Sequence, residues 1–368
     1  MIDEVNKRIY IDNSTRAMFQ ACKEKARLGS FLGYRSKTSA ASLDFGHAIH
    51  AGWEAYYDAL AGGWHDTDGW HTFEELAKPD PFWDEKSELA YTDKTTPTER
   101  AQAAFLRDLG HTGATLPVSL ESEERRSLER GLYLLEAYIY RWRNEPYENI
   151  LINGEPQTEV GFRYFITRWE DYEVYYVGYI DRLMFNKMTQ RPVIFEGKTT
   201  TQNLDLYTGQ SKPNHQVTGY FPAAQALLKQ FFMPGRSEGD VKECVWDAIF
   251  VSSRKPDMKK GLTDRWWSYG IDLDHDFKRH TTTRSRTDIT EFMIELEEDV
   301  QDYCRWLTSG KARWPRTAPG ACHAFGGCQF RNRCSVNLDP EQETQFMESF
   351  FKVERWQPWI KITEKLKS

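Results

Sequence analysis

The sequence predicts an α/β fold in which a central mixed β-sheet is flanked by helices. The apolar pattern has helical spacing before residue 150 and becomes strand-like between residues 159 and 200. A helix, two strands and a long helix are expected after residue 200, so both element types continue to the C-terminal part. With 368 residues and a hydrophobic fraction of 40%, the chain can bury a substantial core in one large domain or two.

The N-terminal part is expected to be mostly helical. Apolar spacing predicts helices over residues 15–28, with Ser14 or Thr15 as N-cap, over 46–60 and over 121–143. Residues 62–100 are polar, punctuated by proline and glycine, and rich in tryptophan. We interpret this stretch as an insertion with short helical pieces, in which the tryptophans serve packing rather than base stacking.

Strands are expected to dominate the middle of the chain. Residues 159–167, 173–185 and 192–200 predict three strands, and a polar turn joins the first two. A helix over 214–230, for which Asn214 is the candidate N-cap, precedes a fourth strand over 244–253. Residues 264–274 predict a fifth strand, and residues 287–309 predict a long helix.

Charge and composition narrow the classes of protein. The formal net charge is −7, so there is no overall basic signal for nucleic acid, although local patches decide binding. The sequence contains no run of about 18 uncharged apolar residues, so a transmembrane helix is not expected. The first residues lack the apolar core of a signal peptide. We therefore expect a cytoplasmic protein with no membrane partner, whose six cysteines are metal ligands or core residues rather than disulfides.

Two carboxylates and a lysine form the most informative pattern. Asp181 lies on the second predicted strand, and Glu196 and Lys198 share one face of the third. Paired carboxylates suit Mg²⁺ or Mn²⁺, and a nearby lysine can orient water or offset charge during phosphodiester hydrolysis. The alternative is that these residues merely end strands on a solvated surface. The apolar residues before them argue against this, because burying unpaired charge is costly.

Three cysteines form a second pattern near the C-terminus. Cys322, Cys328 and Cys334 have five residues between successive members, in a glycine-containing loop that can fold around a centre. Three thiolates need a fourth ligand, and a four-thiolate site suits an iron–sulfur cluster or zinc. His323 can replace one thiolate, which would favour zinc, and three free surface thiols are the remaining alternative. Cys244 and Cys304 are expected to be core residues.

The order of elements, with Ile-Asp-Arg at 180–182 and Phe-Glu-Gly-Lys at 195–198, resembles the PD-(D/E)XK nuclease superfamily. Within it the chain resembles the RecB-like branch, including CRISPR-associated and AddB-type members with an iron–sulfur cluster. Gly46, His50 and Glu54 match the G-x-x-x-H-x-x-x-E helix of that branch, although His47 competes with His50. Gln216 and Tyr220 match its Q-x-x-x-Y helix and share one helix face.

The resemblance implies a restriction-endonuclease-like fold in three parts. These are a mostly helical part with an insertion (1–150), the nuclease core (151–310), and a cysteine-cluster loop with a tail (311–368). His50, Asp181 and Glu196 would hold Mg²⁺ or Mn²⁺, and Glu159 lies where family members often carry an acidic residue. Lys198 would position or activate water, and Gln216 and Tyr220 would support the substrate.

The resemblance also implies a cluster that joins the two ends of the chain. Members of this branch supply one cysteine early and three late, so Cys22 becomes the fourth ligand of a [4Fe–4S] cluster with Cys322, Cys328 and Cys334. The usual spacing of the first late pair is two residues rather than five. This departure keeps zinc as an alternative.

The implied activity is that of a metal-dependent deoxyribonuclease, an exonuclease on single strands or DNA ends. Recombination, repair or phage DNA processing is the expected context, with a helicase or recombinase as candidate partner. The alternative is a non-catalytic DNA-binding subunit that retains the fold and cluster, against which the complete D…E-x-K set argues. Candidate DNA contacts, for which ordinary surface charge is an equal alternative, are Arg254, Lys255, Lys259, Lys260 and Arg284.

Overall fold

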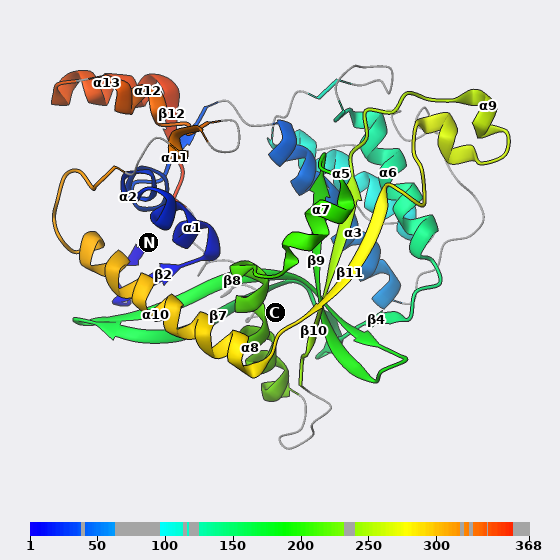
Figure 1. Ribbon diagram of the computed structural model, residues 1–368, viewed down its shortest axis with the longest axis horizontal. Helices are drawn as coiled ribbons and strands as arrows, with labels where there is room; N and C mark the ends of the chain where they lie inside the picture. Colours follow the sequence, from blue (N-terminus) through cyan, green and yellow to red (C-terminus); the bar gives the residue numbers. More distant parts are fainter. Residues whose placement is uncertain are drawn as a thin grey trace.

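The computed structural model describes residues 1–37, 41–62, 96–112, 116–117, 125–231, 240–316, 320–323, 327–336 and 338–355. Most of the tryptophan-rich insertion therefore lies outside the described residues. The helices in Figure 1 are α1 (Asn13–Ala21), α2 (Lys23–Ala26), the π-helical turn η1 (Arg27–Phe31), α3 (Ala41–Ala61), α5 (Pro97–Thr112), α6 (Leu128–Trp142), α7 (Leu204–Thr208), the 3₁₀ turn η2 (Gly209–Ser211), α8 (His215–Phe231), α9 (Met258–Gly261), the 3₁₀ turn η4 (Arg265–Tyr269), α10 (Arg286–Leu307), α11 (Gly320–His323), α12 (Arg331–Ser335) and α13 (Pro340–Phe350). The strands are β1 (Ile2–Asp3), β2 (Arg8–Ile11), β3 (Tyr34–Ser36), β4 (Tyr147–Asn149), β5 (Leu151–Ile152), β6 (Glu155–Pro156), β7 (Thr158–Trp169), β8 (Tyr172–Asn186), β9 (Arg191–Thr200), β10 (Glu243–Phe250), β11 (Phe277–Thr283) and β12 (Phe351–Val353).

A mixed eight-stranded sheet forms the centre of the protein. Its main path runs β1-β2-β8-β9-β10-β11, and β4 and β7 also pair with the long strand β8. β8 and β9 are antiparallel, whereas β9 and β10 are parallel and are joined through α8. The predicted α/β fold with a central mixed sheet flanked by helices is confirmed.

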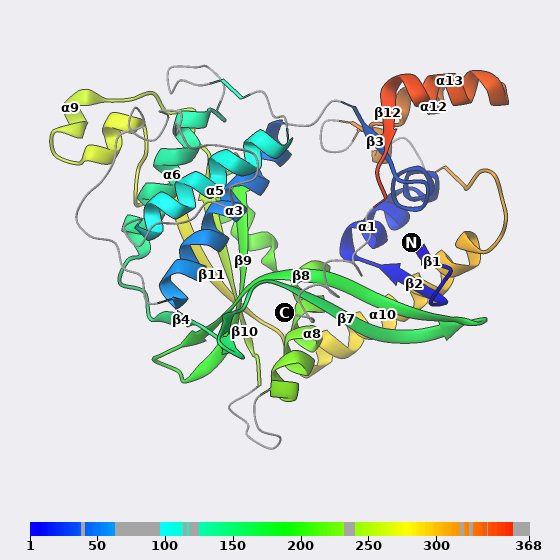
Figure 2. The same cartoon turned by 180° about the vertical axis from the view of Figure 1, so that it is seen from behind.

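Helices cover both sides of this sheet (Figures 1 and 2). One core packs α8 and α10 against the sheet through residues such as Phe221, Leu296 and Tyr176. A second core packs α3, α5 and α6 against β9 and β10, through residues such as Ile49 and Leu135. Because β9 is covered on both faces, residues 192–197 are all buried, which explains the apolar run over 192–195.

The predicted fifth strand is wrong. Residues 265–269 form the 3₁₀ turn η4, because the Asp264 side chain accepts a hydrogen bond from the backbone of Trp266 and Gly270 ends the turn with a left-handed φ of 69°. The fifth strand of the predicted core is instead β11, which follows along the edge of the sheet. Its sequence is polar because only Phe277 and Thr282 are buried among its seven residues.

The N-terminal strand β2 was not predicted either. It adds to the sheet in parallel with β8, from Arg8 opposite Glu173 to Ile11 opposite Tyr176. Its four residues are too few to establish a period, so the sequence alone gives no clear strand signal. The first helix is capped by Asp12, whose side chain accepts from the Thr15 N–H, rather than by Ser14 or Thr15.

Gly197, between Glu196 and Lys198, leaves room for an indole ring. A methyl group at Gly197 would lie 2.2 Å from Cζ3 of Trp53, and Trp53 is itself buried. Gly197→Ala is therefore expected to lower the free energy of unfolding by about 1–3 kcal/mol through overpacking. Urea denaturation measures the loss. The matched variant Gly209→Ala, where no atom lies within 4 Å of the added methyl, should stay close to the parent, and equal stability of the two variants would contradict this account.

Candidate metal and cysteine sites

A cleft of about 860 Å³ gathers most of the predicted catalytic residues. His50 comes from α3, Asp181 from β8 and Lys198 from β9, and Gln216 and Tyr220 come from α8. Four elements thus meet at one place, at the end of the β8–β9 pairing. The exception is Glu196, which is wholly buried beneath the cleft.

Three donor groups in the cleft are close enough to share a cation. The His50 Nδ1 atom lies 3.6 Å from Asp181 Oδ2 and 3.9 Å from Glu159 Oε1. One ligand atom from each of these residues lies within 4.8 Å of the others. Glu159 has a left-handed φ of 45°, which is uncommon for a non-glycine residue and frequent at functional sites. We treat these three residues as the metal triad.

The strand register explains the position of Asp181. Arg182 pairs with Phe195 in the antiparallel β8–β9 ladder, which brings Asp181 beside Glu196 at the next position. There the backbone ladder ends, and the Gly197 N–H donates to Asp181 Oδ2 at 2.6 Å. The predicted proximity of the two carboxylates on neighbouring strands is therefore present.

Glu196 is bound to Lys198 rather than grouped with the metal triad. The Lys198 ammonium contacts Glu196 Oε1, and apart from this ion pair neither Glu196 oxygen has a hydrogen bond within the described ranges. Burial, and next the charge of Asp181, raises the pKa of Glu196 to about 7, against the effect of Lys198. Burial alone would lower the pKa of Lys198, but Glu196 and Asp181 outweigh it and raise that pKa. Glu159 thus occupies the third position of the triad, a role that the sequence did not assign to it.

Electrostatics in the triad favour an added positive charge. Burial raises the pKa of Asp181, the charge of Glu159 adds to this, and His50 and Lys198 oppose it. Burial alone would lower the pKa of His50, but the two carboxylates outweigh it and raise that pKa. The donors also fit a hard cation, since ligand distances of about 2.1 Å place neighbouring ligands about 3.0 Å apart and opposite ligands about 4.2 Å apart.

Gln216 and Tyr220 share one face of α8, as predicted. Gln216 Nε2 donates to the Tyr220 hydroxyl at 2.7 Å, across one helical turn. Burial, with smaller contributions from Glu196 and Asp181, raises the pKa of Tyr220 well above its ordinary value. Tyr220 therefore remains a neutral hydroxyl beside the carboxylates, and both side chains line the cleft.

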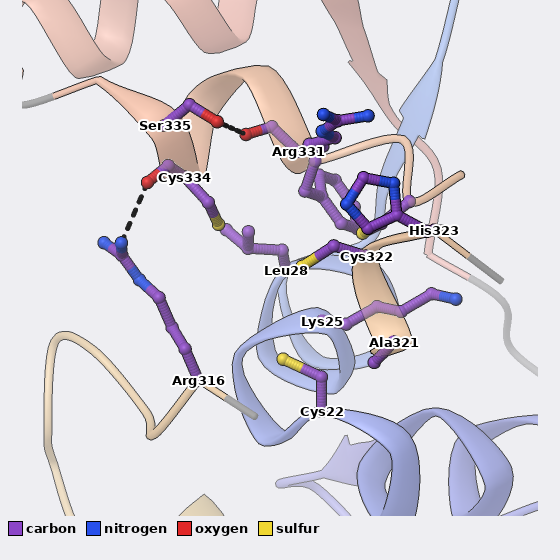
Figure 3. A pocket seen from close by; sticks show the side chains of 12 residues that line it. Cys22, Lys25, Leu28, Arg316, Ala321, Cys322, His323, Arg331, Cys334 and Ser335 are labelled. Carbon is purple, nitrogen blue, oxygen red and sulfur yellow. Dashed lines mark hydrogen bonds between the residues drawn. The ribbon is translucent and has the colours of Figure 1, made fainter. Parts of the chain in front are cut away.

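The four predicted cluster cysteines line a second cavity, of about 310 Å³. Cys22 begins α2, and Cys322, Cys328 and Cys334 come from the C-terminal segment. Figure 3 shows the sulfur atoms of Cys22, Cys322 and Cys334 facing this space. Cys244 and Cys304 are buried in the core, as expected.

The surroundings of this cavity suit a negatively charged thiolate centre. Lys25, Arg316 and Arg331 line it, so three cations are available to offset thiolate charge. Burial raises the pKa of the Cys328 thiol, and Lys25 opposes that shift. His323 lines the same cavity, so the zinc alternative remains compatible with the donor set.

A buried glutamate holds the two halves of the cysteine site together. The Trp314 N–H donates to Glu24 Oε2 at 2.9 Å, and Arg27 donates to both carboxylate oxygens of Glu24. Arg333 lies 3.5 Å from Glu24 Oε1. The segment after α10 is thus fixed against α2 by contacts that do not involve the cysteines.

Two of the five predicted DNA contacts are used inside the protein. Arg284 is buried and donates to the hydroxyls of Thr218 and Thr282. Arg254 donates to both carboxylate oxygens of Asp276, at 2.7 and 3.2 Å. The sequence could not distinguish these structural arginines from phosphate contacts. Lys255, Lys259 and Lys260 are exposed, and the Lys260 ammonium lies 3.9 Å from the ring centroid of Trp267.

Behind the metal triad lies a charge network that the sequence did not reveal. Arg182 Nη2 lies 2.9 Å from Asp247 Oδ2, and both side chains are almost fully buried. Arg279 Nε lies 3.3 Å from Asp247 Oδ1 and also contacts Glu145. Asp247 pairs with Gly197 in the β9–β10 ladder, so the network joins β8 to β10 across the strand that carries Glu196 and Lys198. The only sequence signal was a charged residue inside each of two apolar strands.

No protein-family model matches this chain, and no curated protein sequence matches it at a significant level. Among the helices in the described ranges, none is both long and apolar enough to cross a membrane.

Proposed function

We propose that this protein is a Mg²⁺- or Mn²⁺-dependent deoxyribonuclease with a restriction-endonuclease-like core. The observation that carries the proposal is the convergence of His50, Glu159 and Asp181 beside Lys198 in one cleft. Two carboxylates and an imidazole suit a cation that must also bind phosphate and water. When bound, such a cation neutralises phosphate charge and acidifies a water molecule.

The chain's own residues divide the remaining work. The Lys198 ammonium faces the cleft and can orient a water or offset charge that develops on the phosphate. Its ion pair with Glu196 limits its freedom, so its position is defined before substrate arrives. The Tyr220 hydroxyl, held by Gln216, can contact a phosphate or sugar oxygen.

The activity that we favour is that of an exonuclease on single strands or DNA ends, in recombination, repair or phage DNA processing. Purified protein should therefore release products from end-labelled single-stranded and blunt linear DNA with Mg²⁺ or Mn²⁺. Circular DNA, which has no ends, should not be cleaved. Cleavage of the circles would favour an endonuclease, and no product from any substrate at any metal concentration would favour the non-catalytic DNA-binding alternative.

We also propose that Cys22, Cys322, Cys328 and Cys334 hold a [4Fe–4S] cluster, with zinc as the alternative. A four-thiolate centre would contribute folding free energy and join α2 to the C-terminal segment. Anaerobically purified protein should be brown and contain iron, and Cys22→Ser should lose most of that iron. Visible absorption and metal analysis measure this, with Cys304→Ala as a core cysteine control. Colourless protein containing zinc would select the alternative, and full metal retention by Cys22→Ser would exclude Cys22 as a ligand.

A further inference from the structure

One face of the β7–β8 hairpin carries aromatic and cationic side chains beyond the cleft. Cross-strand pairing places Phe165 opposite Tyr175, and Gly161 opposite Tyr179. Residues that face each other across an antiparallel ladder share a sheet face, and the same face recurs every second residue. Tyr179, on this face, lines the same cavity as Glu159 and Asp181 of the metal triad. We name Arg8, Arg163, Phe165, Tyr175 and Tyr179 the hairpin strip.

The strip is built from ring and guanidinium contacts at the surface. Arg163 lies 5.1 Å and Arg8 5.7 Å from the ring centroid of Tyr175, measured from the guanidinium carbon. The Phe165 ring meets Tyr175 edge to face at 5.7 Å, and Phe165 is 47% exposed. An exposed phenylalanine held by its neighbours offers an apolar face to a ligand.

The charge of the strip is opposite to that of the whole chain. Arg8 and the nearby Arg168 lie 3.5 and 3.8 Å from carboxylate oxygens of Glu173. In contrast, Arg163 pairs with no carboxylate in the part of the chain that the structure describes. Arg8, Arg163 and Arg168 outnumber Glu173 and Asp3, the carboxylates near them, so the strip is locally positive, whereas the chain carries −7 overall. Such a local field favours a polyanion.

The strip is also continuous with the cleft. Tyr179 and its neighbours Val177 and Gly178 line the same cavity as the metal triad. The Tyr179 hydroxyl is buried and has no hydrogen-bond partner among the described residues, so the wall between strip and cleft carries an unsatisfied polar atom. From Asp181 to Tyr175 the strand advances about 20 Å, a length that matches about six stacked nucleotides.

We propose that the hairpin strip holds a single strand of DNA next to the cleft, with a base stacked on the exposed ring of Phe165 and phosphates near Arg8 and Arg163. The inference rests on the proposed nuclease function and specifies its substrate. Aromatic stacking accepts any base, but it needs bases that are not enclosed in a duplex. The strip therefore favours single strands without selecting a sequence.

Binding measured against oligonucleotide length tests the inference. Fluorescein-labelled oligothymidylates of 4 to 16 nucleotides are titrated with the protein in EDTA, which prevents cleavage, and anisotropy is recorded. The affinity of the parent should rise with length until the strip is covered. Arg163→Ala and Phe165→Ala should each weaken the longest oligonucleotide about tenfold and leave the shortest nearly unchanged. Arg191→Ala, an exposed arginine of β9 outside the strip, is the matched control.

Two further variants distinguish base stacking from non-specific apolar binding. Phe165→Trp should preserve the affinity, whereas Phe165→Leu should behave like Phe165→Ala, because leucine lacks a stacking face. Arg163→Ala should also reduce the steepness of the salt dependence by about 0.7 in log–log slope, the value for one lost phosphate contact on a single strand. Equal affinity of all strip variants at every length would overturn the inference.

A cleavage assay on the parent protein distinguishes failure of the strip proposal from failure of the nuclease proposal. A parent that cleaves, with strip variants that bind and cleave all lengths equally well, overturns the strip and leaves the nuclease. A parent that cleaves nothing, yet binds long oligonucleotides through the strip, supports the strip as a binding surface and overturns the catalytic proposal.

Discussion

Asp181→Asn is expected to lower the cleavage rate by about 10²–10³-fold, the range for removing one electrostatic group from an active site. Asparagine keeps the shape of the side chain and can still accept the Gly197 N–H. It removes the charge that would hold the cation between His50 and Glu159. Initial rates on linear DNA over a range of Mn²⁺ concentrations measure the effect, and saturating metal should not restore the parent rate.

The same variant should not lose stability when metal is absent. Burial and the charge of Glu159 raise the pKa of Asp181, so its ionised form opposes folding at neutral pH. The pKa of Asp181 is higher in the folded state than in the unfolded state. The cost therefore appears as the pH rises above the unfolded-state pKa, and it is complete above the folded-state pKa. Asp181→Asn should therefore melt at or above the parent temperature in EDTA at pH 8. Asp205→Asn, an exposed carboxylate on α7, is the control, and unchanged cleavage or a large loss of stability in Asp181→Asn would contradict the role.

Lys198→Ala offers an informative contrast. It should also lose cleavage, but it leaves the Glu196 carboxylate buried without its cation. We expect a lower melting temperature for Lys198→Ala at pH 8 than at pH 5. Burial raises the pKa of Glu196, loss of Lys198 raises it further, and the cost of ionising the buried carboxylate therefore grows with pH. If both variants lose activity but only Lys198→Ala loses stability, the results distinguish a metal ligand, Asp181, from a lysine that pairs with a buried charge.

Asp247→Asn is expected to lower the free energy of unfolding by about 3–5 kcal/mol, the usual result of leaving a buried charge unpaired. Asp247 faces both Arg182 and Arg279; Asp247 and Arg182 are buried, and the Arg279 side chain is only 9% exposed. The two guanidiniums hold the pKa of Asp247 below its ordinary value even though burial acts in the opposite direction. Guanidinium chloride denaturation gives the free energy.

A double substitution tests whether the loss comes from unpaired charge. Arg182→Met with Asp247→Leu replaces the ion pair by apolar groups of similar size, which is often nearly neutral. The double variant should therefore be more stable than Asp247→Asn, and the coupling should be visible in a double-mutant cycle. Additive losses, or an Asp247→Asn variant as stable as the parent, would show that the network does not hold β8 against β10.

The site was predicted most accurately where one element carries its own signal. Glu196 and Lys198 lie on a strand, and Gln216 and Tyr220 lie on one helix face, so local periodicity places them. Spacing grouped Cys322, Cys328 and Cys334, whereas Cys22 was added only through the family resemblance, and all four line one cavity. Local patterns of this kind need no knowledge of distant neighbours.

Contacts between distant segments account for what was missed. Glu159 joins His50 and Asp181 through an unusual backbone angle that no sequence pattern encodes. Arg254 and Arg284 were expected at the surface, but Asp276 and the backbone and hydroxyl acceptors near Ser211 and Thr218 hold them inside. A basic residue with polar neighbours in sequence shows the same local pattern whether it is buried or exposed, because its partner lies far away in the chain.

The position of Cys22 also determines when the proposed cluster can form. Roughly 300 residues separate it from Cys334, and synthesis at ~5–20 residues per second takes roughly 15–60 s to cover them. The neighbouring strands β2 and β3 likewise find their partners late, in β8 and β12. The N-terminal segment therefore waits in an open state while the rest of the chain is made, and its thiol is exposed to oxidants and metals during that time. Growth in an oxidising or metal-poor medium should reduce the yield of correctly assembled protein before it affects the finished molecule.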